Sequence, residues 1–364
     1  MLTSWFGKKT ASATVPQKKF DKKNILVVGG AGFIGSHLCD ALVREHRVIC
    51  LDNFLTGSEA NIDHLLQNPN FEFVRHDIIQ TLNLTEQGER EAGLEKFHIH
   101  WQGIQEVYYL ASPTSENDVE RYPVETLLAN SVGLWNALEL ARQTKAKFLY
   151  ASSDLVYGDF HDGDYRVHEQ RHGVADPVGL RSHHVEAKRF GESLVTVEQR
   201  FHKLDIRIAR IFNTYCPRMK LTDSRLIVDL FRRATANEPI IVYGGADVQG
   251  SYCFVSDIVK GLIKLMESHE TAPVNLGNDQ PVKLTDLAAK VVSLLKSSSS
   301  IEVTSEVPAG YVSQLIPTIE VAKERLDWFP VVLLDDGLAR TLEDLKAGKG
   351  LIIDVTAMAP GAKV

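Results

Sequence analysis

The sequence predicts an α/β protein with a doubly wound parallel sheet and a smaller, mixed α/β C-terminal domain. From Asn24 onward, short β-branched apolar runs alternate with helical stretches, which is typical of parallel strands joined by crossover helices. A glycine-rich turn connects the first apolar run to the first helical stretch. The length of 364 residues also fits two domains of roughly 150 residues each.

Six apolar runs are predicted to be the strands of the sheet. In chain order they are Ile25–Val28, Val48–Asp52, Phe71–Arg75, Glu106–Leu110, Lys147–Ser152 and Asp205–Ile211. The helical stretches between them begin near Gly32, Ala60, Tyr122 and His183, and a last helix is expected near Leu333–Leu345. The polar connection over residues 81–103 is long, so we expect it to be a surface insertion.

The chain is predicted to divide into four parts. Residues 1–23 carry six lysines against one acidic residue and are expected to form a flexible tail. Residues 24–212 form most of the sheet domain and residues 213–346 most of the second domain, with segments free to interleave. Residues 347–364 are a second tail, to which the sequence assigns no role.

Composition excludes several classes of protein. The formal charge of −7 argues against nucleic acid as a partner, because such proteins gain affinity by neutralising phosphates. No apolar stretch approaches the roughly 18 residues that a membrane span needs, so we expect no span and a cytoplasmic location. The four cysteines stand singly, and the histidine pairs lack partners at ligand spacing, so no disulfide framework and no metal site is predicted.

The glycine-rich turn predicts a dinucleotide site. Gly29, Gly32 and Gly35 follow the first strand and open a helix. Glycines at these positions allow a tight turn and close approach of a pyrophosphate, while the helix N-terminus supplies amide donors. Asp52 closes the second strand 17 residues after Gly35, where a carboxylate can accept hydrogen bonds from a ribose diol. This combination is typical of a Rossmann domain.

The residues after Asp52 favour NAD over NADP. Asn53 and Phe54 follow it, so no cation is present to bind a 2′-phosphate that Asp52 would repel. Residues after the third strand are expected to contact adenine, and residues after the fourth strand to flank the other half of the cofactor. The predicted NAD-binding residues are Gly29, Gly32, Phe33, Ile34, Gly35, Asp52, Asn53, Asp77, Ile78, Leu110, Ala111 and Ser112.

Further motifs carry a family resemblance. Gly29–His37, Val156–Asp159, Arg210–Tyr215, Pro217–Met219 and Val255–Asp257 together resemble the extended short-chain dehydrogenase/reductases that modify nucleotide sugars. Within that group the chain is most similar to the UDP-glucuronic acid decarboxylases. The resemblance covers about Asn24 to Leu345 and implies a substrate domain, tightly held NAD and a homodimer. It also implies a reaction in which C4 of UDP-glucuronate is oxidised, the resulting β-keto acid loses carbon dioxide, and C4 is reduced again.

The catalytic set implied by the resemblance is altered. The family uses a Ser or Thr, a Glu two residues later and a Tyr-x-x-x-Lys pair. Ser153 and Lys188 match, His184 stands where Tyr belongs, and Leu155 occupies the Glu position. The predicted catalytic residues are therefore Ser153, His184 and Lys188, and the resemblance implies that Lys188 also binds the nicotinamide ribose.

Three interpretations of His184 remain open. It is a substitute general base, because imidazole titrates near neutrality and a neighbouring ammonium favours its neutral form. Alternatively, it is an inert replacement in a protein that binds NAD without turnover, or another hydroxyl, that of Tyr157, takes over. Asp154 and Glu186 are carboxylates that could replace the missing Glu, although Glu186 faces away from the His184/Lys188 side of the helix.

Arginines that bind the diphosphate and the sugar in the family are also missing. The corresponding segments here are Gln249–Tyr252 and Leu315–Thr318, which contain no arginine. The loss of each such arginine removes charge-assisted contacts worth about 1.5–3 kcal/mol. The remaining predicted substrate-binding residues are Asn213, Arg218, Arg225 and Tyr243. The function predicted is that of an NAD-dependent lyase acting on UDP-glucuronate. The alternatives are a non-catalytic NAD-binding interaction protein and a related epimerase or dehydratase acting on another sugar.

The predicted homodimer would use the helices beginning near Tyr122 and His183. Apolar residues at helical spacing fit either a dimer seam or burial within one chain. They are Leu127, Leu128, Leu134, Leu138, Phe190 and Leu194.

Overall fold

The computed structural model describes residues 21–82, 86–158, 165–215, 217–220, 223–308 and 314–347. The strands are β1 (Asn24–Val28), β2 (Arg47–Asp52), β3 (Phe71–Arg75), β4 (Glu106–Tyr109), β5 (Lys147–Ser153), β6 (Arg166–Val167), β7 (Ile206–Ile211), β8 (Thr214–Tyr215), β9 (Ile240–Tyr243), β10 (Gln249–Gly250), β11 (Cys253–Phe254), β12 (Pro273–Leu276), β13 (Val282–Lys283), β14 (Ile301–Thr304) and β15 (Ile316–Pro317). The α-helices are α1 (Phe33–Leu42), α2 (Glu86–Glu91), α3 (Ile99–Gln102), α4 (Glu116–Arg121), α5 (Pro123–Leu128), α6 (Leu134–Thr144), α7 (Ser182–Val197), α8 (Leu226–Ala236), α9 (Val255–Glu267), α10 (Leu284–Leu295), α11 (Glu320–Leu326) and α12 (Leu334–Lys346). The 3₁₀ segments are η1 (Glu59–Asn61), η2 (Asp63–Leu65), η3 (Glu95–Phe97) and η5 (Asp154–Tyr157), and the π-helical segments are η4 (Ala129–Gly133) and η6 (Glu198–His202).

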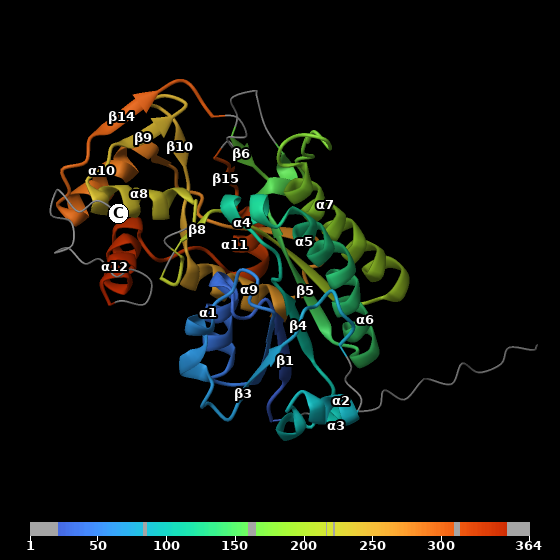
Figure 1. The fold of residues 1–364 in the computed structure, drawn as a ribbon. Coiled ribbons are helices and arrows are strands. Elements are labelled where there is room, and N and C mark those ends of the chain that lie inside the picture. Colours follow the sequence, from blue (N-terminus) through green and yellow to red (C-terminus); the bar gives the residue numbers. More distant parts are fainter. Residues whose placement is uncertain are drawn as a thin grey trace, which may run out of the picture.

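Within the described residues, seven strands form one parallel sheet in the order β12-β7-β5-β4-β1-β2-β3. Figure 1 shows the sheet between helix layers, with α1 and α9 near one another and α5, α6 and α7 together on the other side. Chain order reverses between β1 and β4, because β2 and β3 extend one way and β5 and β7 the other. Such a switch point is where doubly wound folds bind ligands. The predicted Rossmann architecture is confirmed.

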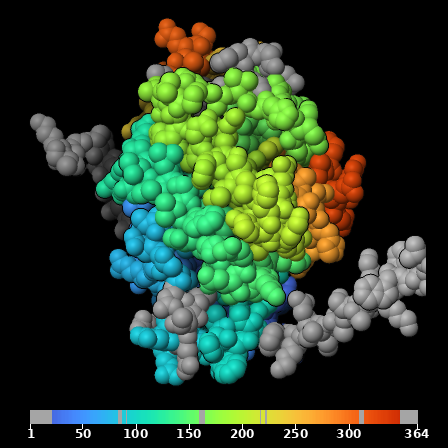
Figure 2. Space-filling model, turned by 90° about the vertical axis from the view of Figure 1, so that its right-hand side faces the viewer, coloured from blue at the N-terminus to red at the C-terminus, as the bar shows by residue number. Residues whose placement is uncertain are grey.

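Both faces of the sheet are buried, as the near-continuous apolar strands require. Along β1, Ile25 and Val27 belong to one hydrophobic cluster, and Leu26 and Val28 belong to another. Successive side chains point to opposite faces of a strand, which places them in different clusters. All four residues are fully buried, so both faces of the sheet are covered. The space-filling view in Figure 2 shows the outer face formed by α5, α6 and α7, coloured green to lime.

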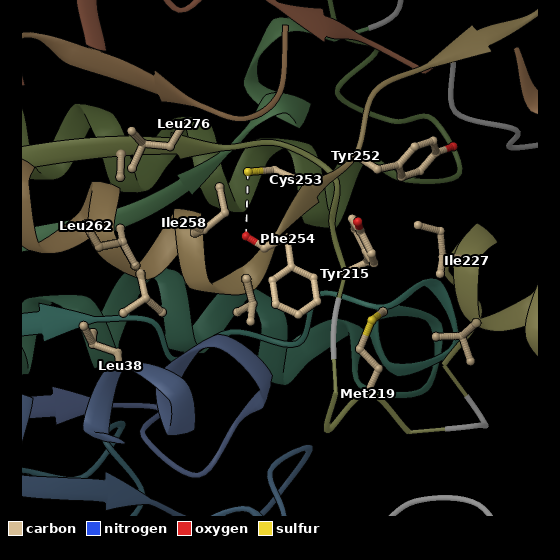
Figure 3. Packing of buried hydrophobic residues seen from close by; sticks show 14 of the residues in the cluster. Leu38, Tyr215, Met219, Ile227, Tyr252, Cys253, Phe254, Ile258, Leu262 and Leu276 are labelled. Atoms are coloured by element: carbon tan, nitrogen blue, oxygen red, sulfur yellow. Dashed lines mark hydrogen bonds between the residues drawn. The ribbon is translucent and has the colours of Figure 1, made fainter. Parts of the chain in front are cut away.

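The second region of the chain joins the sheet through one continuous core. Figure 3 shows Leu38 of α1, Ile258 and Leu262 of α9 and Leu276 of β12 beside Phe254 of β11. The same cluster includes buried residues of α8, α10 and α12, and α8 and α10 pack beside the small β9–β14 pair. Strand β12 and helix α9 lie after residue 212 yet contribute to the sheet domain, so segments of the two parts interleave.

Three local expectations need revision. Strand β12 was not predicted, because Pro273 and Asn275 interrupt its apolar run. The helix expected near Ala60 consists instead of the short 3₁₀ segments η1 and η2. The insertion at residues 81–103 is not confined to the surface, because Leu94, Phe97 and Ile99 are buried in the cluster on one face of the sheet.

Among the described residues, no helix is long and apolar enough to cross a membrane, and no group of His, Cys, Asp or Glu could hold a metal ion. Cys39, Cys50 and Cys253 are buried free thiols, whereas Cys216 lies outside the described residues. Most of the Lys-rich head, residues 1–20, and of the C-terminal tail, residues 348–364, also lies outside them.

Candidate active site

Two cavities lie at the carboxyl ends of the parallel strands, at the switch point between β1 and β4. Gly29, Gly32, Leu110 and Ser112 line both cavities, so the two are continuous. The smaller cavity follows the ends of β2 and β3 and the larger follows β5 and β7. The geometry therefore offers one elongated site that runs across the edge of the sheet.

The glycine turn is shaped for close contact with a ligand. Gly29 has a φ of +81°, and a Cβ placed there would lie 2.7 Å from the backbone nitrogen of Ala111. A Cβ on Gly35 would lie 2.1 Å from the carbonyl oxygen of Gly29. Gly32 begins α1, and within the described residues no side chain caps that helix end. The first-turn amides of α1 are thus open to an anionic group such as a pyrophosphate.

Asp52 lies where the sequence predicts it, in the wall of the smaller cavity. Its carboxylate accepts hydrogen bonds from the backbone nitrogens of Ala31, at 3.0 Å, and Phe54, at 2.8 Å. Asp52 therefore holds the glycine turn, and its remaining lone pairs leave capacity for a ribose hydroxyl. The other predicted residues lining this cavity are Asn53, Asp77, Ile78, Leu110, Ala111 and Ser112.

The larger cavity contains all three predicted catalytic residues, together with Phe33, Ile34 and Gly35. His184 and Lys188 are four residues apart on α7 and so lie on one face of the helix. The ammonium of Lys188 donates to the carbonyl oxygen of Ala151 at 3.0 Å and lies 5.4 Å from the centre of the Tyr150 ring. Burial lowers the pKa of Lys188 to about 7, and the nearby Glu192 carboxylate opposes that change.

His184 is buried and electrically neutral at neutral pH. Burial, followed by the positive charge of Lys188, lowers the pKa of His184 to about 3. Its Nε2 atom is buried and has no hydrogen-bond partner among the described residues. A buried polar atom without a partner costs about 1–3 kcal/mol, so the site carries a hydrogen-bonding capacity that the protein itself leaves unused.

Ser153 ends β5 and begins the 3₁₀ segment η5. Its hydroxyl donates to Oδ1 of Asp154 at 2.8 Å and accepts a hydrogen bond from the backbone nitrogen of Leu155 at 3.3 Å. Asp154 also lines the larger cavity, and burial raises its pKa to about 6. Glu186, the other carboxylate considered, does not line the cavity and instead lies 3.8 Å from Arg189.

Tyr157 is not available as a replacement for the missing tyrosine, contrary to one of the sequence interpretations. It is fully buried, its hydroxyl donates to Oδ1 of Asn275 at 2.6 Å, and it accepts from Arg210 at 3.0 Å. Burial raises the pKa of Tyr157 to about 12. Tyr157 lines neither cavity, because its ring packs in a separate cluster with Phe212.

Three of the four predicted substrate-binding residues line the larger cavity: Asn213, Arg218 and Arg225. Tyr243 does not, because it lies on β9 beside β14. Arg225 is ion-paired with Asp223, and one guanidinium nitrogen of Arg218 is 2.7 Å from Asp40.

Arg218 combines two unusual features. Its φ of +70° is rare for a residue with a side chain, and its backbone nitrogen donates to Asp344 at 3.2 Å. Its Nη1 atom is buried without a partner among the described residues. Arg218 therefore lines the cavity with a strained backbone and with one guanidinium donor unused.

Further residues of this cavity were not predicted from the sequence. Arg181 precedes α7 and forms an ion pair with Glu116 at 2.9 Å, and Gln314 accepts a hydrogen bond from Asn213 at 3.0 Å. Arg181 lies three residues before His184, so helical spacing could have indicated it. Gln314 is 101 residues from Asn213, and no local pattern in the sequence connects them.

A family model described as the NAD dependent epimerase/dehydratase family matches residues 25–277. The chain belongs to the NAD-dependent epimerase/dehydratase family. Within it, UDP-glucuronic acid decarboxylase 6 of Arabidopsis thaliana is 37% identical over 340 residues, which cover 92% of each protein. UDP-glucuronic acid decarboxylase 1 of Xenopus tropicalis is 36% identical over 326 residues, covering 88% of this chain and 72% of the relative.

A solved structure of the same epimerase/dehydratase family shows the same fold. The UDP-glucuronic acid 4-epimerase of Bacillus cereus in complex with NAD has a TM-score of 0.73 and 25% identity, and the match covers 89% of this chain and 99% of that one. The cofactor is therefore NAD, and the general activity of the family is NAD-dependent modification of nucleotide sugars. The glycine turn, the open end of α1 and the position of Asp52 fit this cofactor.

Proposed function

We propose that this member of the family is a lyase of the UDP-glucuronate decarboxylase type with a modified catalytic centre. One observation carries the proposal: Ser153, His184 and Lys188 meet in a cavity that is continuous with the dinucleotide cradle. Identity of 36–37% to UDP-glucuronic acid decarboxylases over most of the chain supports this choice of reaction.

NAD, when bound, supplies reversible oxidation at C4 of the sugar, which makes the C5 carboxylate a β-keto acid that loses carbon dioxide readily. Lys188 anchors the cofactor ribose, because its ammonium has three donors and only one is used on Ala151. With a pKa near 7, Lys188 is protonated in only part of the molecules at neutral pH. Its positive charge, where present, also favours the loss of a proton from a nearby hydroxyl. Ser153 provides a hydroxyl at the cavity wall that orients the substrate hydroxyl.

His184 replaces the family's tyrosine as a hydrogen-bond partner of the sugar. In its neutral form, imidazole has one ring nitrogen that donates and one that accepts. A substrate hydroxyl at Nε2 would satisfy the buried atom that lacks a partner. The low pKa of His184 makes its protonation costly, so its role is to position the hydroxyl.

The substrate anion is held by fewer cations than in the relatives. Arg218 is the strongest candidate, because it lines the cavity and its buried Nη1 has no partner among the described residues, while the charge of Arg225 is already balanced by Asp223. Asn213 would have to exchange Gln314 for the substrate. We therefore expect UDP-glucuronate to bind more weakly here than in a protein that has unpaired arginines.

The test uses purified protein loaded with NAD and mixed with UDP-glucuronate. A transient rise in NADH absorbance together with release of carbon dioxide supports the proposal. Silence in both measurements, for the wild type and for a His184→Tyr variant, contradicts it. Calorimetric titration with UDP and with UDP-glucuronate then separates a different sugar substrate from a protein that binds no nucleotide.

A second candidate function is a non-catalytic NAD-binding protein. The favouring observation is that the three arginines lining the larger cavity are each ion-paired: Arg181 with Glu116, Arg225 with Asp223, and Arg218 with Asp40. A nucleotide diphosphate would then meet little unbalanced positive charge. This candidate predicts NAD binding without measurable affinity for UDP or UDP-glucuronate.

A homodimer is also part of the proposal. Exposed apolar side chains are frequent on the helices that form the outer face around α5, α6 and α7: Val124 and Leu127 of α5, Val132 of η4, Trp135 of α6, Phe190 and Val197 of α7, and Phe201 of η6. Leu134 and Leu138 are instead buried inside the chain. Contiguous exposed apolar patches on a folded protein are typical of interaction sites. For the location, we retain the cytoplasm, in keeping with three buried free thiols.

A further inference from the structure

Asp154 is a carboxyl group in the larger cavity that the proposed reaction has not yet used. It follows Ser153 at the end of β5, lines the same cavity as His184 and Lys188, and accepts a hydrogen bond from the Ser153 hydroxyl at 2.8 Å. Within the described part of the chain, no cation forms an ion pair with it. Carboxylates that serve only to stabilise a fold are normally paired when they are removed from water.

Several charged groups share the cavity with Asp154, although none of those described forms an ion pair with it. On η5 itself, no other residue is charged. The packed helix α7 presents His184 and Lys188, and the remaining charged residues lining the cavity are Glu116, Asp118, Arg181, Arg218, Lys220, Asp223 and Arg225. Burial raises the pKa of Asp154, and hydrogen bonds from Ser153 and from the backbone oppose that rise.

We infer that Asp154 is the catalytic acid–base group of this protein and exchanges protons with the substrate through the Ser153 hydroxyl. The inference rests on the proposed function. During oxidation, the substrate hydroxyl loses its proton to Oγ of Ser153, while the original Ser153 proton moves along the existing hydrogen bond to Oδ1 of Asp154. The hydrogen on the substrate carbon leaves with two electrons to NAD, the oxidant, and a carbonyl remains. On reduction the same protons return.

The other two groups in the cavity are less suited to hold the proton. His184 resists protonation because it is buried and lies beside Lys188. The Lys188 ammonium already carries its proton over part of the physiological range and is held by Ala151. A carboxyl that titrates close to the working pH is the better acid–base catalyst, since it can both accept and return the proton.

The first measurement is a ¹³C NMR titration of aspartate carboxyl groups in the NAD-loaded full-length protein. We expect a carboxyl with a pKa of about 6 that disappears in Asp154→Asn. In Ser153→Ala the same pKa should rise further, because the lost hydrogen bond favours the charged form. A pKa of Asp154 near 3.8, or one that does not change in Ser153→Ala, overturns the inference, and the pH dependence of the reaction rate separates a catalytic from a structural carboxyl.

The second measurement is the rate of the first NADH transient with UDP-glucuronate as a function of pH. The wild-type rate should rise through an inflection near about pH 6, and Asp154→Asn should lose roughly 100-fold together with the inflection. Unchanged circular dichroism and NAD affinity would show that the variant is folded. A wild-type rate and pH profile in Asp154→Asn overturns the inference.

The two measurements separate the inference from the proposed function. If the wild type gives no transient at any pH, the proposed decarboxylase function fails, and the NMR titration still decides the state of Asp154. A pKa near 6 that rises in Ser153→Ala then supports a proton-exchanging Ser153–Asp154 pair acting on another substrate. A pKa in the ordinary range for aspartate refutes the pair for any substrate.

Discussion

Replacing Asp154 with Asn should stabilise the protein at neutral pH. Because burial disfavours its charge, the pKa of the Asp154 carboxyl is raised from the ordinary value of 3.8 to about 6. Its contribution to stability is therefore fully present below about pH 3.8 and is lost as the pH rises through about 6. Each pKa unit corresponds to about 1.4 kcal/mol, so ionising the buried group costs up to about 3 kcal/mol. Asn keeps the hydrogen-bond acceptor for Ser153 without the charge.

The assay is urea unfolding of NAD-free protein, followed by circular dichroism at about pH 4 and about pH 7.5. The free energy of unfolding of Asp154→Asn minus that of the wild type should increase by about 2–3 kcal/mol between the two pH values. Subtracting the free energy of unfolding of the wild type cancels the contribution of Lys188 titration, because both proteins contain Lys188. A pH-independent difference, or a variant that is less stable than the wild type at pH 7.5, would refute the reasoning.

Asp223→Asn is the matched control for this experiment. Asp223 lines the same cavity and its side chain is 7% exposed, but it is ion-paired with Arg225. Removing its charge leaves Arg225 without that partner, so the variant should be less stable than the wild type at neutral pH. Opposite signs for the two substitutions would separate an unpaired carboxyl from a paired one in one cavity.

Three further variants test other parts of the molecule. Gly35→Ala should weaken NAD binding at least about tenfold in a fluorescence titration, because its Cβ would lie 2.1 Å from the Gly29 oxygen; unchanged affinity contradicts the close approach. Glu192→Gln should lower the free energy of unfolding by about 3 kcal/mol, since it breaks the largely buried pair with Arg210, and a loss below about 0.5 kcal/mol would be incompatible with that account. Phe201→Asp should convert the dimer into a monomer in size-exclusion chromatography with light scattering, and a monomeric wild type would disprove the dimer.

Much of the dinucleotide cradle could be predicted because its signals are local. A strand, a turn of three spaced glycines and a helix are adjacent in sequence, and the acidic end of β2 follows within the same unit. Each of these features expresses a backbone requirement or a hydrophobic period that acts over a few residues. The same reasoning missed β12, since Pro273 and Asn275 interrupt its apolar run and its place in the sheet is set by pairing with β7.

The lining of the larger cavity, where we propose the catalytic centre, was predicted only in part. The spacing of His184 and Lys188 on one helix placed both in the cavity, and Ser153 joined them from the end of β5. Tyr157 is also close in sequence to Ser153, yet the fold directs its hydroxyl to Asn275, 118 residues away. A tyrosine in a sequence carries no sign of whether its hydroxyl will be free, because that depends on partners brought by distant strands.

The sequence by itself determined the parallel sheet, the NAD cradle and the residue types available for catalysis, because local spacing and hydrophobic pattern encode them. The tertiary structure decided which of those residues are free to act. Arg218 is partly neutralised by Asp40, 178 residues away, whereas the partly buried Asp154 has no ion-pair partner in the described part of the chain. Charge pairing and desolvation depend on which groups meet in three dimensions, and these two properties set whether a carboxyl or a guanidinium holds the fold together or holds a substrate.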